Sequence, residues 1–401
     1  MVSKRIRQAR LAAGLSLDEC VERLKSKNFS ITKPALSQYE NGKRRPNPTV
    51  LLKLSEIFSL PASWFLGTAT DCTMKWYSYR AQISLGKATR ESIKAYAALE
   101  AEKRAFVYSL FPESVKANFP QRKKISSIPD SDSFAADLRK RWNLGTGPLE
   151  SVTQTLEIQG AMIVHYNGQQ TAKFDGMSAI VNDIWPMLII NPDVPVDRLR
   201  FDLTHELGHI IMDTYSLGST KEEESAAHRF ASSFLLPPPS LKKELGTKRH
   251  NLSLHELLLL KEKFGISVSA SLYAARTHGI ITERLFVKLR KELSIRGWRK
   301  KEPDVFCGNE KPARMRQLLT RAVAENLITL GKVSAFFPDI AEELKGEFPA
   351  VVVEGRGEML RKLPKAQRDA ILLKAAENAA KEYCKNADLI ADDDHGYYEY
   401  D

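Results

Sequence analysis

Two histidines separated by three residues stand near the middle of the chain. The segment His205-Glu206-Leu207-Gly208-His209 has the form H-E-x-x-H. This spacing places both imidazoles on one side of a helix, one turn apart, where two nitrogens can bind one zinc ion. Glu206 follows the first histidine directly and is the candidate general base. The pattern predicts hydrolysis assisted by Zn²⁺, which lowers the pKa of a water molecule whose proton Glu206 takes and passes to the leaving amine.

Two ligands do not complete a catalytic zinc site, so a third should follow nearby. Residues 222–231 contain a run of three glutamates followed by small residues. Ala227 and Ala231 would let a helix formed by this segment approach the first helix closely, and Glu224 lies on their side. An acidic run is also a common solvated surface, so the residues alone leave open whether Glu224 is a ligand.

The H-E-x-x-H motif falls in a segment with the pattern of an amphipathic helix. Leu199, Leu203, Leu207 and Ile211 recur on one face of that helix. Asp197 precedes them and is predicted to be the N-cap. A metal site on a buried helix needs such an apolar face on its other side, so the motif and the helix pattern agree.

Strands are predicted before this helix, at residues 161–166, 177–181 and 187–190. The last two flank the turn at Asn182 and Asp183, which indicates a hairpin. The strand at 177–181 either holds an extended peptide by edge pairing or is an ordinary core strand. The alternation of helices and strands predicts an α+β domain.

The middle of the chain also resembles a known family. The segments KFDGMSAIV, RFDLTHELGHIIMD and EESAAHRFASSFLLPP together are similar to the ImmA/IrrE-type metallopeptidases, over roughly residues 130–300 and including GWRKKEP near the end. In that family's pattern, a glutamate three residues before the alanine of an A-N-x-F-A stretch is the third zinc ligand, and Glu224 has that position. The resemblance implies a zincin-like fold and a zinc endopeptidase whose substrate is typically a repressor protein.

Two polar residues near the motif have open roles. The family commonly has Asn or Asp where this chain has His228, one turn after Glu224. His228 could support a metal ligand, be a core histidine or replace a ligand. Asp213, four residues after His209, could orient that imidazole or be a simple surface acid.

The N-terminal part of the chain is basic and predicted to be all-helical. Residues 1–68 hold twelve Lys and Arg against five Asp and Glu, a net charge of +7. Turn and capping signals divide residues 3–67 into five short helices. A compact basic domain at one end of a chain fits a polyanionic partner.

Two segments of this part, RQARLAAGLSLDE and KPALSQYENGKRRPNP, resemble the Cro/repressor-type (XRE) helix-turn-helix domains. The resemblance implies that the third helix enters the major groove of a double-stranded DNA operator, while Leu36 and Tyr39 pack inward. The insertion KSKNFS before that helix is longer than the family's usual turn. A homodimer on a palindrome is expected, although no dimer interface is visible. The candidate base contacts are Lys33, Pro34, Ser37 and Gln38, and the candidate phosphate contacts are Lys43, Arg44 and Arg45.

The bulk composition is that of a globular protein. The 401 residues, 43% hydrophobic and 27% charged with a net charge of +11, are enough for two or three domains. No apolar run is long enough for a membrane span and the N-terminus is too charged for a signal peptide, so we expect a cytoplasmic protein. The four cysteines lie far apart and are expected to be inert thiols.

The sequence therefore predicts a multidomain protein: an all-α helix-turn-helix domain, an α+β zincin-like metallopeptidase domain and a mostly helical C-terminal region. Two functions fit it. One is a DNA-binding regulator with a zinc endopeptidase that cleaves a specific protein, and the other is a DNA-binding repressor whose zinc domain is a sensor or scaffold. Glu206 favours the peptidase, because a structural zinc site needs no base. The expected boundaries are 1–68 for the helix-turn-helix domain, 69–130 for a helical connector with a hinge at 121–133, 131–302 for the peptidase domain, 303–384 for the helical region and 385–401 for an acidic tail.

Overall fold

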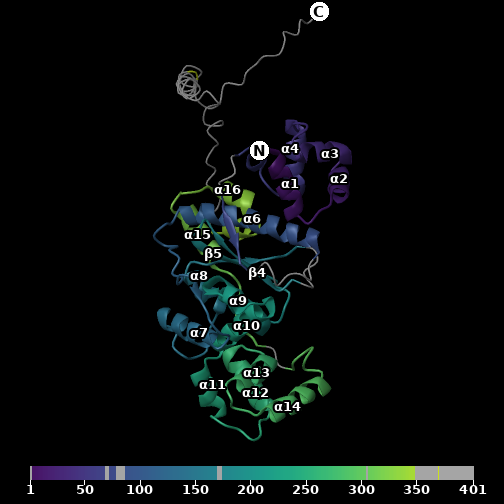
Figure 1. Ribbon diagram of the computed structural model, residues 1–401. Helices are drawn as coiled ribbons and strands as arrows, with labels where there is room; N and C mark the ends of the chain where they lie inside the picture. The colour runs from purple at the N-terminus through teal and green to yellow at the C-terminus, as the bar shows by residue number, and fades with distance from the viewer. Residues whose placement is uncertain are drawn as a thin grey trace, which may run out of the picture. The chain divides into compact units, whose positions relative to one another are not determined.

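The computed structural model describes residues 2–67, 72–77, 86–168, 174–303, 306–347 and Asp369. The chain divides into two compact units, Met1–Ile340 and Ala341–Asp401. The predicted acidic tail and most of the second unit lie outside the described residues. Figure 1 shows the order of the elements along the chain.

The basic N-terminal part folds into five helices, as predicted. Ser16 and Glu19 form a capping box at the second helix, and Thr32 caps the third through the backbone amide of Ala35. Leu36 and Tyr39 are buried in the core of this part, which confirms their inward orientation. The helices are α1 (Val2–Ala12), α2 (Leu17–Ser26), α3 (Lys33–Glu40), α4 (Pro48–Phe58) and α5 (Ala62–Leu66).

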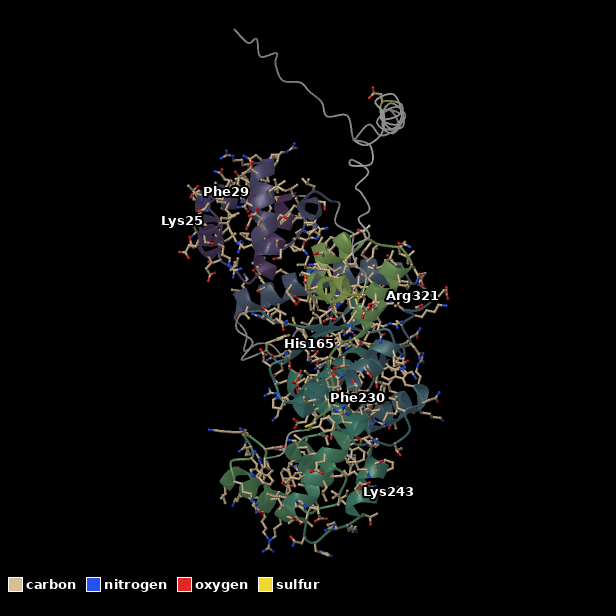
Figure 2. The ribbon with its side chains drawn as sticks, turned by 180° about the vertical axis from the view of Figure 1, so that it is seen from behind. Lys25, Phe29, His165, Phe230, Lys243 and Arg321 are labelled. Carbon is tan, nitrogen blue, oxygen red and sulfur yellow. The ribbon has the colours of Figure 1, made fainter. Side chains whose placement is uncertain are left out.

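The insertion between α2 and α3 forms an ordered turn. Asn28 adopts a left-handed conformation with φ 56°, which an asparagine tolerates better than most residues. Phe29, labelled in Figure 2, and Ile31 then pack against the helical core. The extra length therefore adds apolar contacts to the domain.

A long helix, α6 (Lys87–Ser109), belongs to two cores. On one face, Leu99 is buried in the same cluster as the five N-terminal helices, and Glu102 pairs with Arg5 of α1 at 2.5 Å. On another, the hydroxyl of Tyr96 donates to the carbonyl of His165, and that of Tyr108 donates to the carbonyl of Ala161. The predicted helical connector thus packs on both of the parts that it joins.

Four strands form a mixed sheet in the order β1 (Met74–Trp76), β4 (Gly176–Val181), β5 (Trp185–Ile190) and β3 (Met162–His165). β4 and β5 are antiparallel, with Val181 opposite Trp185, whereas β3 runs parallel to β5. The turn between β4 and β5 has positive φ at both Asn182 and Asp183. Such a turn matches the twist of paired strands, and the predicted hairpin is confirmed.

Two short strands lie in the region expected to be a helical connector. β1 pairs antiparallel with β4 along residues 179–181, so over this length β4 has a neighbour on both sides. This favours the core-strand interpretation of β4 there over edge pairing with a substrate. β2 (Lys123–Lys124) pairs in parallel with β6 (Met212–Asp213). Backbone hydrogen bonds therefore attach part of the predicted hinge at 121–133 to the domain that contains β6.

Helices surround the sheet and build the main core. α9 packs against β4 and β5 and lies side by side with α10 (Figure 1). Ser253 and Glu256 form the predicted capping box at α12, and Gly265 ends that helix with φ 63°. The helices are α7 (Asp130–Arg141), α8 (Val152–Ile158), α9 (Val196–Ile211), α10 (Thr220–Leu235), α11 (Pro238–Leu245), α12 (Leu254–Phe264), α13 (Val268–Thr277) and α14 (Glu283–Ile295).

The predicted cap of α9 is wrong. The N-cap position is Pro195, and Asp197 lies inside the first turn with its carboxylate buried. Asp197 faces Lys261 of α12 at 3.4 Å, and Lys261 also pairs with Glu302 at 2.8 Å. The carboxylate of Asp197 therefore pairs with a lysine of another helix and does not cap the backbone amides of α9.

The C-terminal helices described are α15 (Arg314–Ala324), α16 (Leu330–Phe336) and α17 (Pro338–Lys345). The segment before them is fastened to the middle domain by Glu310, whose carboxylate accepts hydrogen bonds from the amides of Val152 and Thr153 and pairs with Arg200 at 2.6 Å. A carboxylate at the first turn of α8 also complements the helix dipole. No helix of the described residues is long and apolar enough to cross a membrane.

Candidate metal and peptidase site

Helices α9 and α10 bring three potential metal ligands together. Nε2 of His205 lies 3.1 Å from Nε2 of His209 and 3.2 Å from Oε2 of Glu224, and Nε2 of His209 lies 3.4 Å from Oε1 of Glu224. The edges of a tetrahedron around zinc with bonds of about 2.0–2.1 Å are about 3.4 Å long. The donor set and its spacing therefore fit a tetrahedral zinc ion with three protein ligands.

Small residues allow this approach of the two helices. A Cβ added at Gly208 would lie 3.1 Å from the ring of Phe230 and 3.5 Å from Cα of Ala227. Ala227 and Ala231 are fully buried, as the pattern of small residues predicted. A larger residue at Gly208 would push α10 away and separate Glu224 from the histidines.

His209 and Glu224 shift the pKa values of one another. Burial raises the pKa of Glu224, but hydrogen bonds from His205 and His209 outweigh it and hold that pKa well below its usual range. Burial lowers the pKa of His209, but its hydrogen bond with Glu224 and the charge of Glu206 raise it above its usual value. The carboxylate is therefore ionised at neutral pH, as a metal ligand must be.

Glu206 points from α9 toward β4. Its Oε2 accepts a hydrogen bond of 2.7 Å from the hydroxyl of Ser178, and the residue is only 5% exposed. A Cβ added at Gly176 would lie 3.0 Å from Cγ of Glu206 and 2.8 Å from Cδ1 of Ile190. Gly176 and Ser178 thus shape the space of this carboxylate. Sequence reasoning missed both, because no local pattern shows which strand residue faces the helix.

The contacts of His228 and Asp213 bear on the roles that the sequence left open for them. The ring of His228 lies 4.5 Å from that of His205 and 5.8 Å from that of Phe201, with the residue exposed to solvent. His228 therefore contacts the potential ligand His205 from outside the cluster of three, and burial of its imidazole between these rings lowers its pKa to about 4. Asp213 accepts a hydrogen bond from the amide of Tyr215. Nδ1 of His205 is buried and has no partner among the described residues.

A second carboxyl group lies one turn before the motif. Burial raises the pKa of Asp202 to about 7, and the charge of Asp175 adds to this effect, against the opposing charge of Arg198. The distance between Arg198 Nε and Asp202 Oδ2 is 3.6 Å. The sequence pattern gave no reason to single out this residue.

The DNA-contact candidates lie along α3 and just after it. Lys33 pairs with Asp18 at 2.7 Å, and both side chains are more than half exposed. The guanidinium of Arg44 lies 5.8 Å from the ring centre of Tyr39. Ser37 is half-buried, whereas the remaining candidates are exposed, namely Pro34, Gln38, Lys43 and Arg45.

Two family models match separate parts of the chain. Residues 6–65 match the helix-turn-helix family, and residues 161–276 match a peptidase family described as the IrrE N-terminal-like domain. The chain therefore combines an N-terminal helix-turn-helix domain with an IrrE-like peptidase domain, which confirms both resemblances. No curated protein matched the chain. The first domain indicates DNA-binding regulation, and the second contains the cluster of His205, His209 and Glu224.

Proposed function

We propose that this protein is a DNA-binding transcriptional regulator with a zinc-dependent endopeptidase that cleaves a specific repressor-type protein. The observation that carries the proposal is the cluster of His205, His209 and Glu224, three donor atoms spaced as zinc requires. Glu206 lies next to the first histidine in sequence and is held by Ser178. Three ligands and an adjacent base are the parts of a catalytic site, whereas structural zinc sites have four protein ligands.

Glu206 acts as the general base and then as the general acid. It removes a proton from the attacking water and returns it to the amine of the leaving chain. A zinc ion held by the three ligands would supply acidity to the water and polarise the scissile carbonyl. The hydroxyl of Ser178 keeps the carboxylate of Glu206 in one orientation, and the buried setting restricts bulk water at that oxygen.

The helix-turn-helix domain selects the DNA. Lys33, Pro34, Ser37 and Gln38 would face bases, and the basic triplet after α3, residues 43–45, would contact phosphates. The ion pair between Lys33 and Asp18 is exposed, so exchanging it for a DNA contact costs little. Since one such domain reads only a half-site, we infer a homodimer on a palindromic operator in the cytoplasm.

A second candidate function follows from α6. This helix packs on the helix-turn-helix core through Leu99 and on β3 through Tyr96 and Tyr108. A metal-dependent change in the peptidase domain would reach the DNA-binding core through it. In that case the zinc domain is a sensor or scaffold without significant proteolysis.

Trapping with a Glu206→Gln variant separates the two functions. The variant keeps the ligand set, so it should retain about one zinc per chain and hold its substrate without cleaving it. Mass spectrometry of co-purified proteins should then identify a repressor-type protein, which the wild-type chain cleaves. If no protein is retained and the wild type cleaves none of the DNA-bound repressors of its cell, the sensor function is the correct one.

A further inference from the structure

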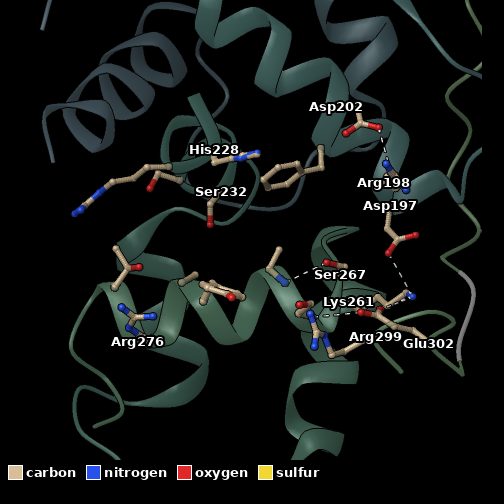
Figure 3. Close-up of a pocket in the computed structure, with 18 of the residues that line it drawn as sticks. Asp197, Arg198, Asp202, His228, Ser232, Lys261, Ser267, Arg276, Arg299 and Glu302 are labelled. Atoms are coloured by element: carbon tan, nitrogen blue, oxygen red, sulfur yellow. Dashed lines mark hydrogen bonds and ion pairs between the residues drawn. The ribbon is translucent and has the colours of Figure 1, made fainter. Parts of the chain in front are cut away.

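A cavity of about 1040 Å³ opens beside the metal cluster. One wall is formed by α9 and α10 and includes Glu224 and His228, and the other is formed by α13 and residues 298–302. Figure 3 shows His228 and Ser232 on one side and Arg276 and Arg299 on the other. Because Glu224 is part of the lining, a polypeptide that enters this cavity lies next to one of the three potential ligands.

Four basic side chains of the lining have no counter-charge. Lys221, Arg299, Lys300 and Lys301 are exposed, and none of them forms an ion pair with a described residue. Other cations of the lining are already paired. Arg229, for example, binds Asp132 at 2.6 Å. The uncompensated charge of the cavity is therefore positive and lies at its rim.

The three consecutive cations are held in place. Glu302 follows them, and its carboxylate accepts hydrogen bonds from the amides of Val268 and Ser269 at the first turn of α13. It also pairs with Lys261, which is 4% exposed. The contacts of Glu302 with α12 and α13 therefore hold the neighbouring residues 299–301 at the cavity.

We propose that this cavity binds an acidic stretch of the substrate polypeptide on one side of the bond that is cut. The inference rests on the proposed peptidase function and names the substrate class of that site. Carboxylates of the substrate meet the cations of Lys221 and residues 299–301. The cavity shares Glu224 with the proposed peptidase site, so we assign it to the substrate polypeptide, and binding of a nucleic acid is an outcome of the test.

Binding is tested with the full-length, zinc-loaded Glu206→Gln protein and two fluorescent twelve-residue peptides that differ only in four Glu-to-Gln replacements. We expect the acidic peptide to bind about tenfold more tightly at low salt. The Lys300→Glu/Lys301→Glu variant should lose this preference. The Lys288→Glu/Lys291→Glu variant should keep it, since those lysines are exposed on α14 and outside the lining.

Equal binding of the two peptides would overturn the inference. So would persistence of the preference in Lys300→Glu/Lys301→Glu, which would place the acidic peptide elsewhere, such as on the basic helix-turn-helix domain. Displacement of the peptide from the cavity by a single-stranded oligonucleotide at lower concentration than by an acidic peptide would assign the site to nucleic acid.

Cleavage of a random peptide library by the wild-type protein separates this inference from the proposed function. We expect Asp and Glu to be enriched within a few residues of the cut on one side only, with Lys300→Glu/Lys301→Glu removing the enrichment. Cleavage without acidic preference refutes the inference and leaves the peptidase intact. Binding of the acidic peptide without cleavage of any library member or cellular protein refutes the proposed peptidase and leaves an acidic-peptide site.

Discussion

The hydroxyl of Ser178 on β4 donates a hydrogen bond of 2.7 Å to Oε2 of Glu206 on α9. The two residues are 28 positions apart, and both are buried. The hydrogen bond to one oxygen of the carboxylate fixes the orientation of the other oxygen, which can accept a proton. A general base must lie within hydrogen-bond distance of the proton that it removes, so this orientation affects catalysis directly. Ser178 is thus the positioning residue of the proposed base.

Ser178→Ala should lower the rate of peptide cleavage without removing zinc. Loss of a hydrogen bond to a charged group costs about 1.5–3 kcal/mol, so kcat should fall about ten- to hundredfold while KM changes little. Ser271→Ala is the matched control, because Ser271 is fully buried on α13 and its hydroxyl has no partner among the described residues. Unchanged kcat in Ser178→Ala would show that the contact does not position the base.

The metal prediction concerns the ligands alone. His205→Ala should lose zinc in elemental analysis of the purified protein, because two remaining ligands do not form a tetrahedral site. His255→Ala is the control, since His255 is exposed on α12 and outside the cluster. Full zinc occupancy in a His205→Ala/His209→Ala double variant would show that the metal binds elsewhere.

The sequence predicted those parts of the site that follow from local spacing. The periodic leucines of α9 and the H-E-x-x-H motif fix which side of one helix carries the histidines, and Glu224 needed the family resemblance to stand out from its acidic neighbours. Gly176 and Ser178 could not be predicted, because the packing of β4 on α9 decides which residues of the strand face Glu206. The local sequence does not show that packing. Asp197 was wrongly assigned as a cap for the same reason, since its partner Lys261 lies on another helix.

The stability of the protein should fall when the ion pair between α1 and α6 loses one of its charges. The side chains of Arg5 and Glu102 are 5% and 12% exposed, and Trp64 also donates a hydrogen bond to Glu102. Glu102→Gln leaves a buried guanidinium without its counter-charge, which costs about 3–5 kcal/mol. Urea unfolding followed by circular dichroism should show this loss.

The exposed pair of Lys53 and Glu56 provides the control for that measurement. Its partners are 30% and 49% exposed, so Glu56→Gln should cost less than about 1 kcal/mol. If Glu102→Gln were as mild as Glu56→Gln, the ion pair of α1 and α6 would contribute little to stability.

Asp202 should make the stability of the metal-free protein depend on pH. Burial raises its pKa to about 7 in the folded chain, whereas an unfolded aspartate titrates near pH ~3.9. The folded state therefore binds the proton more tightly, so the protein loses stability as pH rises from 4 through 7. Asp202→Asn removes this loss. In EDTA, its melting temperature should exceed that of the wild type at pH 8 and approach it at pH 4, and a difference independent of pH would contradict the assignment.

The last prediction concerns the two domains together. A peptidase joined to a DNA-binding domain meets other proteins on the same operator at a raised effective concentration. Cleavage of the natural partner at low protein concentration should therefore be faster when both proteins share an operator fragment than when the fragment has a scrambled sequence. High salt should reduce both rates to one baseline, because it releases the proteins from DNA.

Two variants separate this tethering from catalysis itself. Arg44→Ala should weaken binding to all DNA sequences, reduce the salt slope by about one unit, and reduce the operator-dependent acceleration while leaving the baseline rate unchanged. Glu206→Gln should abolish cleavage and leave operator affinity unaltered, because Glu206 is neither a metal ligand nor part of α3. Equal cleavage rates with operator and scrambled DNA would refute tethering but not the peptidase. Loss of operator binding in Glu206→Gln would instead mean that the zinc domain acts on DNA binding through α6, as the sensor function requires.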